Sequence, residues 1–322
     1  MREAAFIKQN KAKWVTFESA LSNKNTIVPS ELSDLYIEIT DHLSYAKTFY
    51  PNSNTEAYLN QLSVQAHQKI YKTQKEGKNR LVTFWKTEFP LAFYHHQKEL
   101  LISFLVFLFF SVMGAFSAAN DGDFIRAVLG DGYVNMTMEN IAKGDPMGVY
   151  KEQGSFNMFL GITINNIKVG IFAFSLGILG GIGTLFVLMQ NAIMLGSFQY
   201  FFYEKGLLWE SVRTVWIHGT IEIFIIIVAG AAGLVAAKGI FFPETYTRLT
   251  SFKNGVLNGL KVLTSTIPFF VIAGFLEGFV TRHTEMPDWL AIIIILSSLI
   301  LMVFYYIVYP RLIYKKQPNA YD

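Results

Sequence analysis

An apolar segment long enough to cross a lipid bilayer, residues 217–239, carries two ionisable residues near its start. About 20 helical residues, each rising about 1.5 Å, span a hydrocarbon core of about 30 Å. His218 and Glu222 are one helical turn apart and therefore share a face of such a helix. An ionisable group inside a bilayer costs about 2.5–3.5 kcal/mol and usually faces a partner, a polar cavity or a substrate. The segment therefore predicts an inner helix with a polar site.

A stripe of small residues runs along the same segment. Ala229, Gly233 and Ala237 recur at four-residue spacing, which lets a second helix approach closely. This stripe favours tight packing within the protein, and it also makes a homodimer an expectation.

The remaining apolar runs predict an all-α fold: a polytopic membrane helical bundle of about six transmembrane helices. Hydrophobic residues make up 52% of the 322 residues, and the mean hydropathy is +0.33. The expected spans are 100–119, 158–182, 184–203, 212–237, 259–280 and 289–309. The run 158–203 is about 69 Å long as a helix, which suffices for two spans. Its glycines mark the expected reversal; one span plus a re-entrant hairpin is the alternative.

Two polar regions flank the first span. Residues 1–98 have helical periodicity and predict a cytoplasmic helical domain, followed by the bundle over 99–314. Within this domain, 81–93 mixes aromatic residues with Lys86 and Glu88, which predicts a helix lying on the membrane surface. An ordinary core helix of the domain is the alternative. Residues 120–155 predict a flexible, solvated acidic loop, since their aspartates lack the ligand spacing of a calcium-binding loop.

The distribution of Lys and Arg predicts the orientation. Residues 1–98 contain 13 Lys and Arg, whereas 120–155 contain three against six Asp and Glu. Because basic residues concentrate in cytoplasmic segments, we expect both termini to be cytoplasmic and 120–155 to be extracytoplasmic. A net charge of +3 gives no reason to expect nucleic acid, and the absence of cysteine excludes disulfides and thiolate metal ligands.

In this orientation, several polar residues of different spans lie in the outer half of the membrane. Since lone polar groups facing lipid are unfavourable, we expect one shared polar cluster. Its candidate members are His218, Glu222, Glu277, Asn165, Asn166 and Lys168, with Asn191 expected to lie deeper.

Several long motifs resemble the stage II sporulation protein M family of integral membrane proteins. They are REAAFIKQNKAKW, DHLSYAKTFYP, TFWKTEFP, NNIKVGIFAFSLGILGGIGTLFVLMQN, HGTIE and FLEGFVT. The resemblance implies that the recurrent polar positions of the family fall here on Asn165, Asn166, Asn191, His218, Glu222 and Glu277. This chain has Ile217 where the family often has a proline, and Ala192 where it often has a glycine.

The resemblance implies a bacterial inner-membrane protein that acts by binding other proteins and is not expected to be an enzyme. The expected function is a non-enzymatic scaffold or assembly factor for cell-envelope proteins, without a cofactor and surrounded by membrane lipid. In this interpretation His218, Glu222 and Glu277 form a structural staple held by hydrogen bonds. The family suggests cell-wall enzymes, RDD-type membrane proteins and MoxR-type ATPases as partners. A transporter or channel using the polar cluster is the first alternative. A metal-dependent intramembrane hydrolase is the second, although Gly219 after His218 rules out an HExxH motif.

Overall fold

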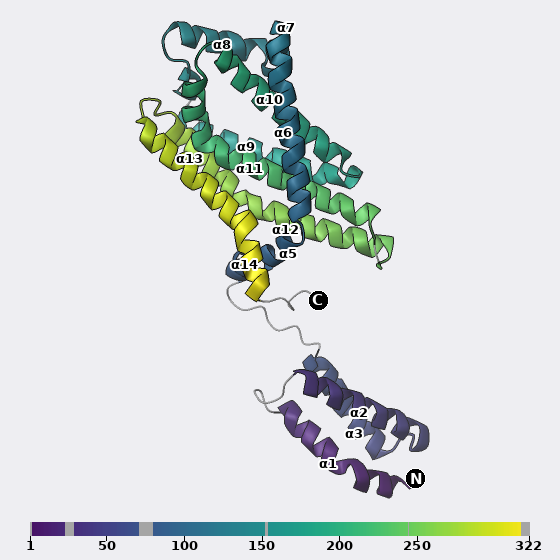
Figure 1. Ribbon diagram of the computed structural model, residues 1–322. Helices are drawn as coiled ribbons and strands as arrows, with labels where there is room; N and C mark the ends of the chain where they lie inside the picture. Colours follow the sequence, from purple (N-terminus) through teal and green to yellow (C-terminus); the bar gives the residue numbers. More distant parts are fainter. Residues whose placement is uncertain (1, 23–28, 71–79, 152–153, 244, 317–322) are drawn as a thin grey trace. The chain divides into compact units, whose positions relative to one another are not determined.

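The computed structural model describes residues 2–22, 29–70, 80–151, 154–243 and 245–316, and their regular structure is helical throughout. The chain divides into two units, Met1–Arg80 and Leu81–Asp322 (Figure 1). The first contains α1 (Glu3–Ser22), α2 (Pro29–Phe49) and α3 (Asn54–Ile70). These helices enclose a core of their own that includes Trp14, Phe17 and Leu59. The first unit is therefore a small helical domain with its own apolar core.

The described residues of the second unit form six helices that are long and apolar enough to cross a membrane, which confirms the predicted all-α membrane bundle. Three of them are single helices: α6 (Gln97–Asn120), α10 (Ile182–Glu204) and α11 (Leu208–Phe241). Two end in a short turn of another helical type: α9 (Ser155–Ser175) in η3 (Leu176–Leu179), and α12 (Arg248–Phe275) in the π-helical turn η4 (Leu276–Thr281). The last is α13 (Asp288–Val303), which continues through the π-helical turn η5 (Phe304–Val308) into α14 (Tyr309–Lys316). The run 158–203 forms two of these helices.

The reversal between α9 and α10 rests on two consecutive glycines. Gly180 and Gly181 have φ angles of 69° and 81°, a left-handed conformation that a residue with a Cβ rarely adopts. The chain can therefore turn back directly into the next span.

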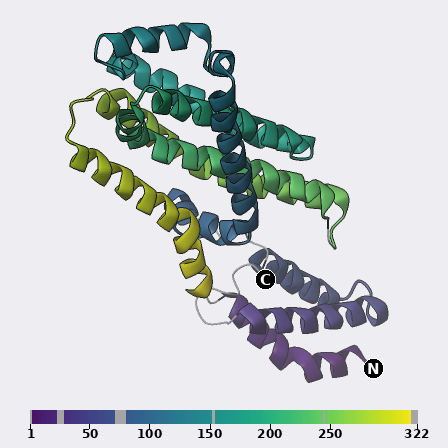
Figure 2. The same cartoon turned by 45° about the horizontal axis from the view of Figure 1, so that its top comes forward.

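Helix α11 lies at the centre of the bundle (Figures 1 and 2). It packs against α6, α9, α10, α12 and α13. In its most apolar window 78% of residues are buried, against 22% for α6 and for α13 with α14. The outer helices thus offer their apolar side chains to lipid, and α11 supplies the interior of the bundle.

The segment 81–93 belongs to the second unit, so the division falls earlier than the expected boundary at residue 98. It forms α4 (Arg80–Thr83), the π-helical turn η1 (Phe84–Glu88) and the start of α5 (Phe89–Tyr94). Phe89 and Phe93 are fully buried and pack against the ring of Tyr306 in η5. This aromatic packing ties the segment to the bundle; its position at the membrane surface remains a prediction.

Residues 120–151 are largely helical, which corrects the expectation that this region is a flexible acidic loop. They form α7 (Gly122–Leu129), α8 (Asp131–Ala142) and the short turn η2 (Gly148–Lys151), which lie across one end of the bundle (Figures 1 and 2). Apolar side chains of this segment share a core with side chains of α10 and α11. The charged residues serve local structure: Asp121 caps α7 by accepting from the Asp123 amide at 3.0 Å, and Lys151 pairs with Asp145. We call this segment the α7–α8 cap.

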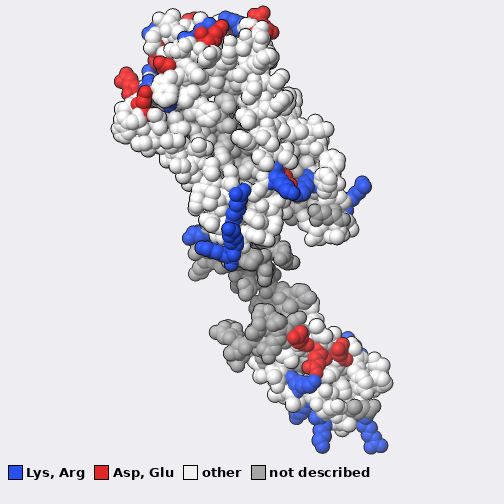
Figure 3. All heavy atoms as spheres, in the orientation of Figure 1, with Lys and Arg blue, Asp and Glu red and all other residues white. Residues whose placement is uncertain are grey.

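The surface charges lead to a topology prediction. Acidic and basic side chains are both visible at the end that carries the cap, whereas Lys and Arg predominate around α5 and α14 (Figure 3). This asymmetry favours a cytoplasmic location for α14 and an external one for the cap. A cysteine introduced at the exposed Gly132 of α8 is expected to react with an impermeant maleimide added outside intact cells. A matched cysteine at Lys315 of α14 should react only after permeabilisation, and the reverse pattern would contradict the orientation.

Candidate functional site

Three ionisable side chains meet beneath the α7–α8 cap. His218 and Glu222 lie one turn apart on α11, and Glu277 comes from η4. One ligand atom from each of the three side chains lies within 4.8 Å of those of the other two. The His218 Nε2 atom is 3.7 Å from Glu277 Oε2, and His218 is only 3% exposed. The structure thus brings together, on two adjacent helices, the three residues at the centre of the predicted cluster.

The π-helical turn η4 supplies a second contact to the histidine. Thr281 is buried and lies one turn beyond Glu277, so both side chains face α11. The Thr281 Oγ1 atom is 2.9 Å from His218 Nδ1. Both imidazole nitrogens therefore face a polar group, which fixes the orientation of the ring.

A pocket of about 330 Å³ opens beside these side chains. Its walls come from α6, α10, α11 and η4, and its roof comes from the cap. The polar lining residues are Tyr133, Tyr150, Asn191, His218, Glu222 and Glu277. The pocket is therefore mixed in character, with an apolar body and several convergent polar groups, as is typical of small-ligand sites.

Two tyrosines of the cap keep their protons at the pocket. The ring centre of Tyr150 lies 5.8 Å from that of His218. Burial, reinforced by the Glu277 carboxylate, raises the pKa of Tyr150 well above its ordinary value. Burial also raises the pKa of Tyr133 to about 12. Both side chains therefore remain neutral phenols near neutral pH and can donate hydrogen bonds.

Of the other residues predicted for the cluster, two lie on helix faces directed at the site and two lie on exposed faces. Asn166 is buried, and its side-chain amide faces the Glu222 carboxylate. Asn191 lines the pocket and donates from Nδ2 to the Val187 carbonyl at 2.8 Å. Asn165 and Lys168 are exposed. Successive residues of a helix differ by about 100° in direction, so these two positions point away from the face of Asn166.

Close packing of α11 closes the bundle below the pocket. From Ile225 to Ala237 every residue except Leu234 is buried. Ser103 of α6 donates to the Ile227 carbonyl at 2.6 Å. A Cβ atom at Gly230 would lie 2.6 Å from the Ser103 Oγ atom. Helices α6 and α11 are therefore in close contact here, and this stretch of α11 is packed inside the bundle.

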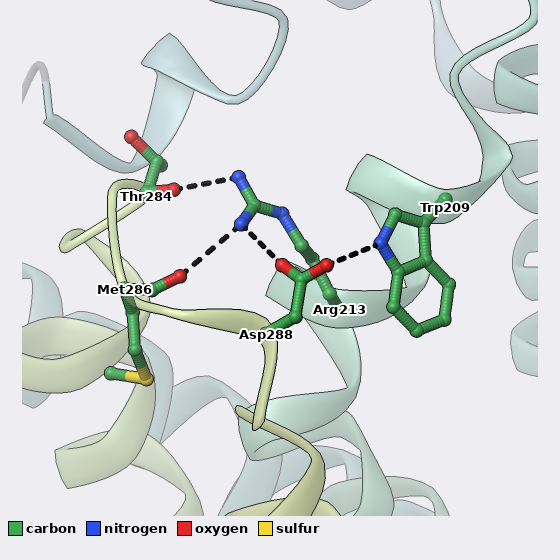
Figure 4. Close-up of polar contacts among 5 residues, drawn as sticks. All are labelled: Trp209, Arg213, Thr284, Met286 and Asp288. Carbon is green, nitrogen blue, oxygen red and sulfur yellow. Dashed lines mark hydrogen bonds and ion pairs between the residues drawn. The ribbon is translucent and has the colours of Figure 1, made fainter. Parts of the chain in front are cut away.

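A polar clamp holds the start of α11 to the turn before α13 (Figure 4). Arg213 Nη1 lies 2.9 Å from Asp288 Oδ1, and the same guanidinium donates to the carbonyls of Thr284 and Met286. Trp209 Nε1 donates to the other carboxylate oxygen of Asp288 at 3.0 Å. The clamp fixes the chain that follows η4, and hence helps to set the positions of Glu277 and Thr281.

Replacing Arg213 by glutamine is expected to loosen this turn without unfolding the bundle. The variant loses the ion pair and two hydrogen bonds to carbonyls at a partly exposed site, where the energetic contribution is modest. Hydrogen–deuterium exchange should rise over 282–288 and stay unchanged in α6. The matched control is Arg311→Gln on α14. Unchanged exchange over 282–288 would show that the clamp does not order the turn.

Comparisons with known proteins divide the chain much as the structure does. The model of the family Stage II sporulation protein M matches residues 103–282, which include the whole cluster and its pocket. The model described as Domain of unknown function (DUF8413) matches residues 4–72, which lie in the first unit. No curated protein and no solved structure matches the chain.

Proposed function

Because the chain belongs to the stage II sporulation protein M family of integral membrane proteins, we propose that it is a non-enzymatic scaffold or assembly factor for cell-envelope proteins. The observation that carries this proposal is a pocket that is open at one end of the bundle and closed below by packed protein. Such a site suits binding, because a bound group would contact the α7–α8 cap and α11 together. The pocket thus links the α7–α8 cap to the core of the bundle.

The first unit suits contacts with further partners. It has an apolar core of its own, and it precedes in the sequence the residues that the sporulation-protein family model matches. In this proposal the protein resides in the bacterial cytoplasmic membrane with both termini inside, so that the cap meets envelope partners and the first unit meets cytoplasmic ones. Cell-wall enzymes, RDD-type proteins and MoxR-type ATPases are the partners that the family suggests.

A transporter is the second candidate, and the clustering of His218, Glu222 and Glu277 at the pocket favours it. Ionisable residues inside a membrane commonly mark ion or proton pathways. Transport would require α11 and its neighbours to separate below the pocket, where Gly230 is in close contact with Ser103 and Leu188. The packed floor therefore makes binding the better-supported function.

Photo-crosslinking in living cells tests the scaffold proposal. A photoreactive amino acid replaces the exposed Met138 of the cap or the exposed Ile37 of α2, and lipid-facing Phe109 of α6 provides the control position. We expect discrete adducts with envelope proteins at Met138 and Ile37, and lipid adducts at Phe109. Absence of protein adducts at both positions, together with ion flux through proteoliposomes that Glu222→Gln abolishes, would establish the transporter instead.

A further inference from the structure

We infer that His218, Glu222 and Glu277 bind one divalent transition-metal ion of the zinc type between α11 and η4. This inference rests on the proposed function in that it takes the pocket to be a ligand site. It adds the chemical class of the ligand and the atoms that hold it.

The geometry of the three side chains fits such an ion. Zinc bound to imidazole nitrogen and carboxylate oxygen at about 2.0–2.2 Å places tetrahedral ligand atoms about 3.4 Å apart. The distance from His218 Nε2 to Glu277 Oε2 is 3.7 Å, and all three ligand atoms lie within 4.8 Å of one another. Small side-chain rotations therefore suffice to close the ligand set, and the backbone can remain in place.

The two carboxylates of the site are suited to a cation. They lie close together in a largely buried position, and His218 is the ionisable group within ion-pair distance of Glu277. Arg213 is engaged by Asp288, and Lys168 is exposed on another face of α9. Two buried carboxylates are unfavourable unless one takes up a proton or a cation binds between them. A divalent ion balances both carboxylates and leaves His218 neutral, as metal coordination requires.

The surrounding groups provide the second layer of contacts that metal sites use. A metal-bound histidine generally hydrogen-bonds through its other nitrogen, and Thr281 Oγ1 lies 2.9 Å from His218 Nδ1. Asn166 is 5% exposed, and its side-chain amide faces the Glu222 carboxylate. This amide can keep its contact with the carboxylate when Glu222 binds a metal, as the groups around metal ligands commonly do.

The ligand set also selects the class of metal. One imidazole and two carboxylates suit zinc, cobalt, manganese and iron(II) rather than soft copper(I), which prefers sulfur ligands. Three protein ligands leave a coordination position directed at the pocket, where Tyr150 lies close to His218. The ion would thus join α11, η4 and the cap at one point.

Metal binding by the purified full-length protein tests the inference. Metal-free protein is titrated with Co²⁺, whose visible absorption reports coordination geometry, and bound Zn²⁺ is measured by mass spectrometry after dialysis. We expect about one ion per chain in the wild type. His218→Gln and Glu277→Gln should each weaken binding more than about 100-fold, and Thr281→Val about 10- to 100-fold. The matched controls, His283→Gln and Glu285→Gln in the exposed turn after η4, should bind as the wild type does.

If a variant fails to fold, metal binding by the wild-type protein still decides the test. A folded wild-type protein that binds no Co²⁺ or Zn²⁺, or binds them equally after Glu277→Gln, would overturn the metal site. Protein that captures envelope partners but binds no metal would contradict this inference alone. Protein that binds metal but captures no partner would contradict the scaffold proposal alone.

Discussion

Replacing Gly196 by valine is expected to prevent α10 from packing against α6. A Cβ atom at this position would overlap the carbonyl oxygen of Ser111 and lie 2.9 Å from the amide nitrogen of Ala115. Both obstacles are backbone atoms, so no side-chain rotation can make room, and the two helices would have to separate. Overpacking of a well-packed core typically costs about 1–3 kcal/mol, and we expect more than about 3 kcal/mol for this contact.

Thermal unfolding in mild detergent measures the effect of Gly196→Val. Gly161→Val on α9 is the matched control, because a Cβ atom at Gly161 meets no other atom within 4 Å. The control should elute and melt close to the wild type, whereas the Gly196 variant should aggregate on extraction. A Gly196→Val protein that melts with the control would show that α6 and α10 do not approach as closely as described.

Replacing Tyr306 by alanine is the second large expected loss. The side chain is fully buried, and its ring contacts those of Phe89, Phe93 and Phe224. Its hydroxyl donates to the Ser265 carbonyl at 3.0 Å. Removing a large buried aromatic side chain costs about 3–5 kcal/mol, because it leaves a cavity as well as exposing apolar surface. Tyr306→Phe keeps the ring and loses the hydroxyl contacts with the carbonyl oxygen and the Oγ atom of Ser265, at a cost of about 1 kcal/mol.

The free energy of unfolding, obtained by titration with a denaturing detergent, tests the expected ranking of the stability losses. Phe304→Ala is the matched control on the same turn, since Phe304 is 46% exposed. We expect Tyr306→Ala to be far less stable than Tyr306→Phe, and Phe304→Ala to lie near the wild type. Equal losses for Tyr306→Ala and Phe304→Ala would contradict the anchoring of α5 on η5.

The sequence predicts the spans well because membrane thickness constrains them strongly. A helix must hold about 20 apolar residues to cross, and six such runs are present. The same reasoning misses the α7–α8 cap. Ile125 and Val134 are buried there against side chains such as Phe202 of α10, and this partner lies far away in the sequence. Local composition therefore indicates a polar loop, whereas tertiary contacts make the segment helical.

The sequence predicts the depth of the site residues in the membrane, but it does not predict which side of each helix faces the interior of the bundle. The spacing of His218 and Glu222 places both on one face, and the order of the spans brings Glu277 to the same height. The depth of a residue does not show which side of α9 faces inward. The sequence therefore predicts Asn165 and Lys168 in the cluster together with Asn166, although both are exposed.

Sequence reasoning also missed two neighbours of His218. Thr281 carries a usable signal, since it follows Glu277 by one helical turn. Tyr150 carries none, because its approach to His218 depends on how the cap folds over the bundle.

The central claim is that His218, Glu222 and Glu277 form a ligand site rather than a structural staple. The most direct test is the unfolding free energy of the double variant Glu222→Gln, Glu277→Gln, measured with and without Zn²⁺. Without metal, we expect the variant to be at least as stable as the wild type, because two close carboxylates are removed from a buried position. Added Zn²⁺ should stabilise the wild type by about 2.7 kcal/mol at 100 times its dissociation constant, and leave the variant unchanged. A metal-free variant that is less stable than the wild type, with no response of the wild type to Zn²⁺, would identify the cluster as a staple.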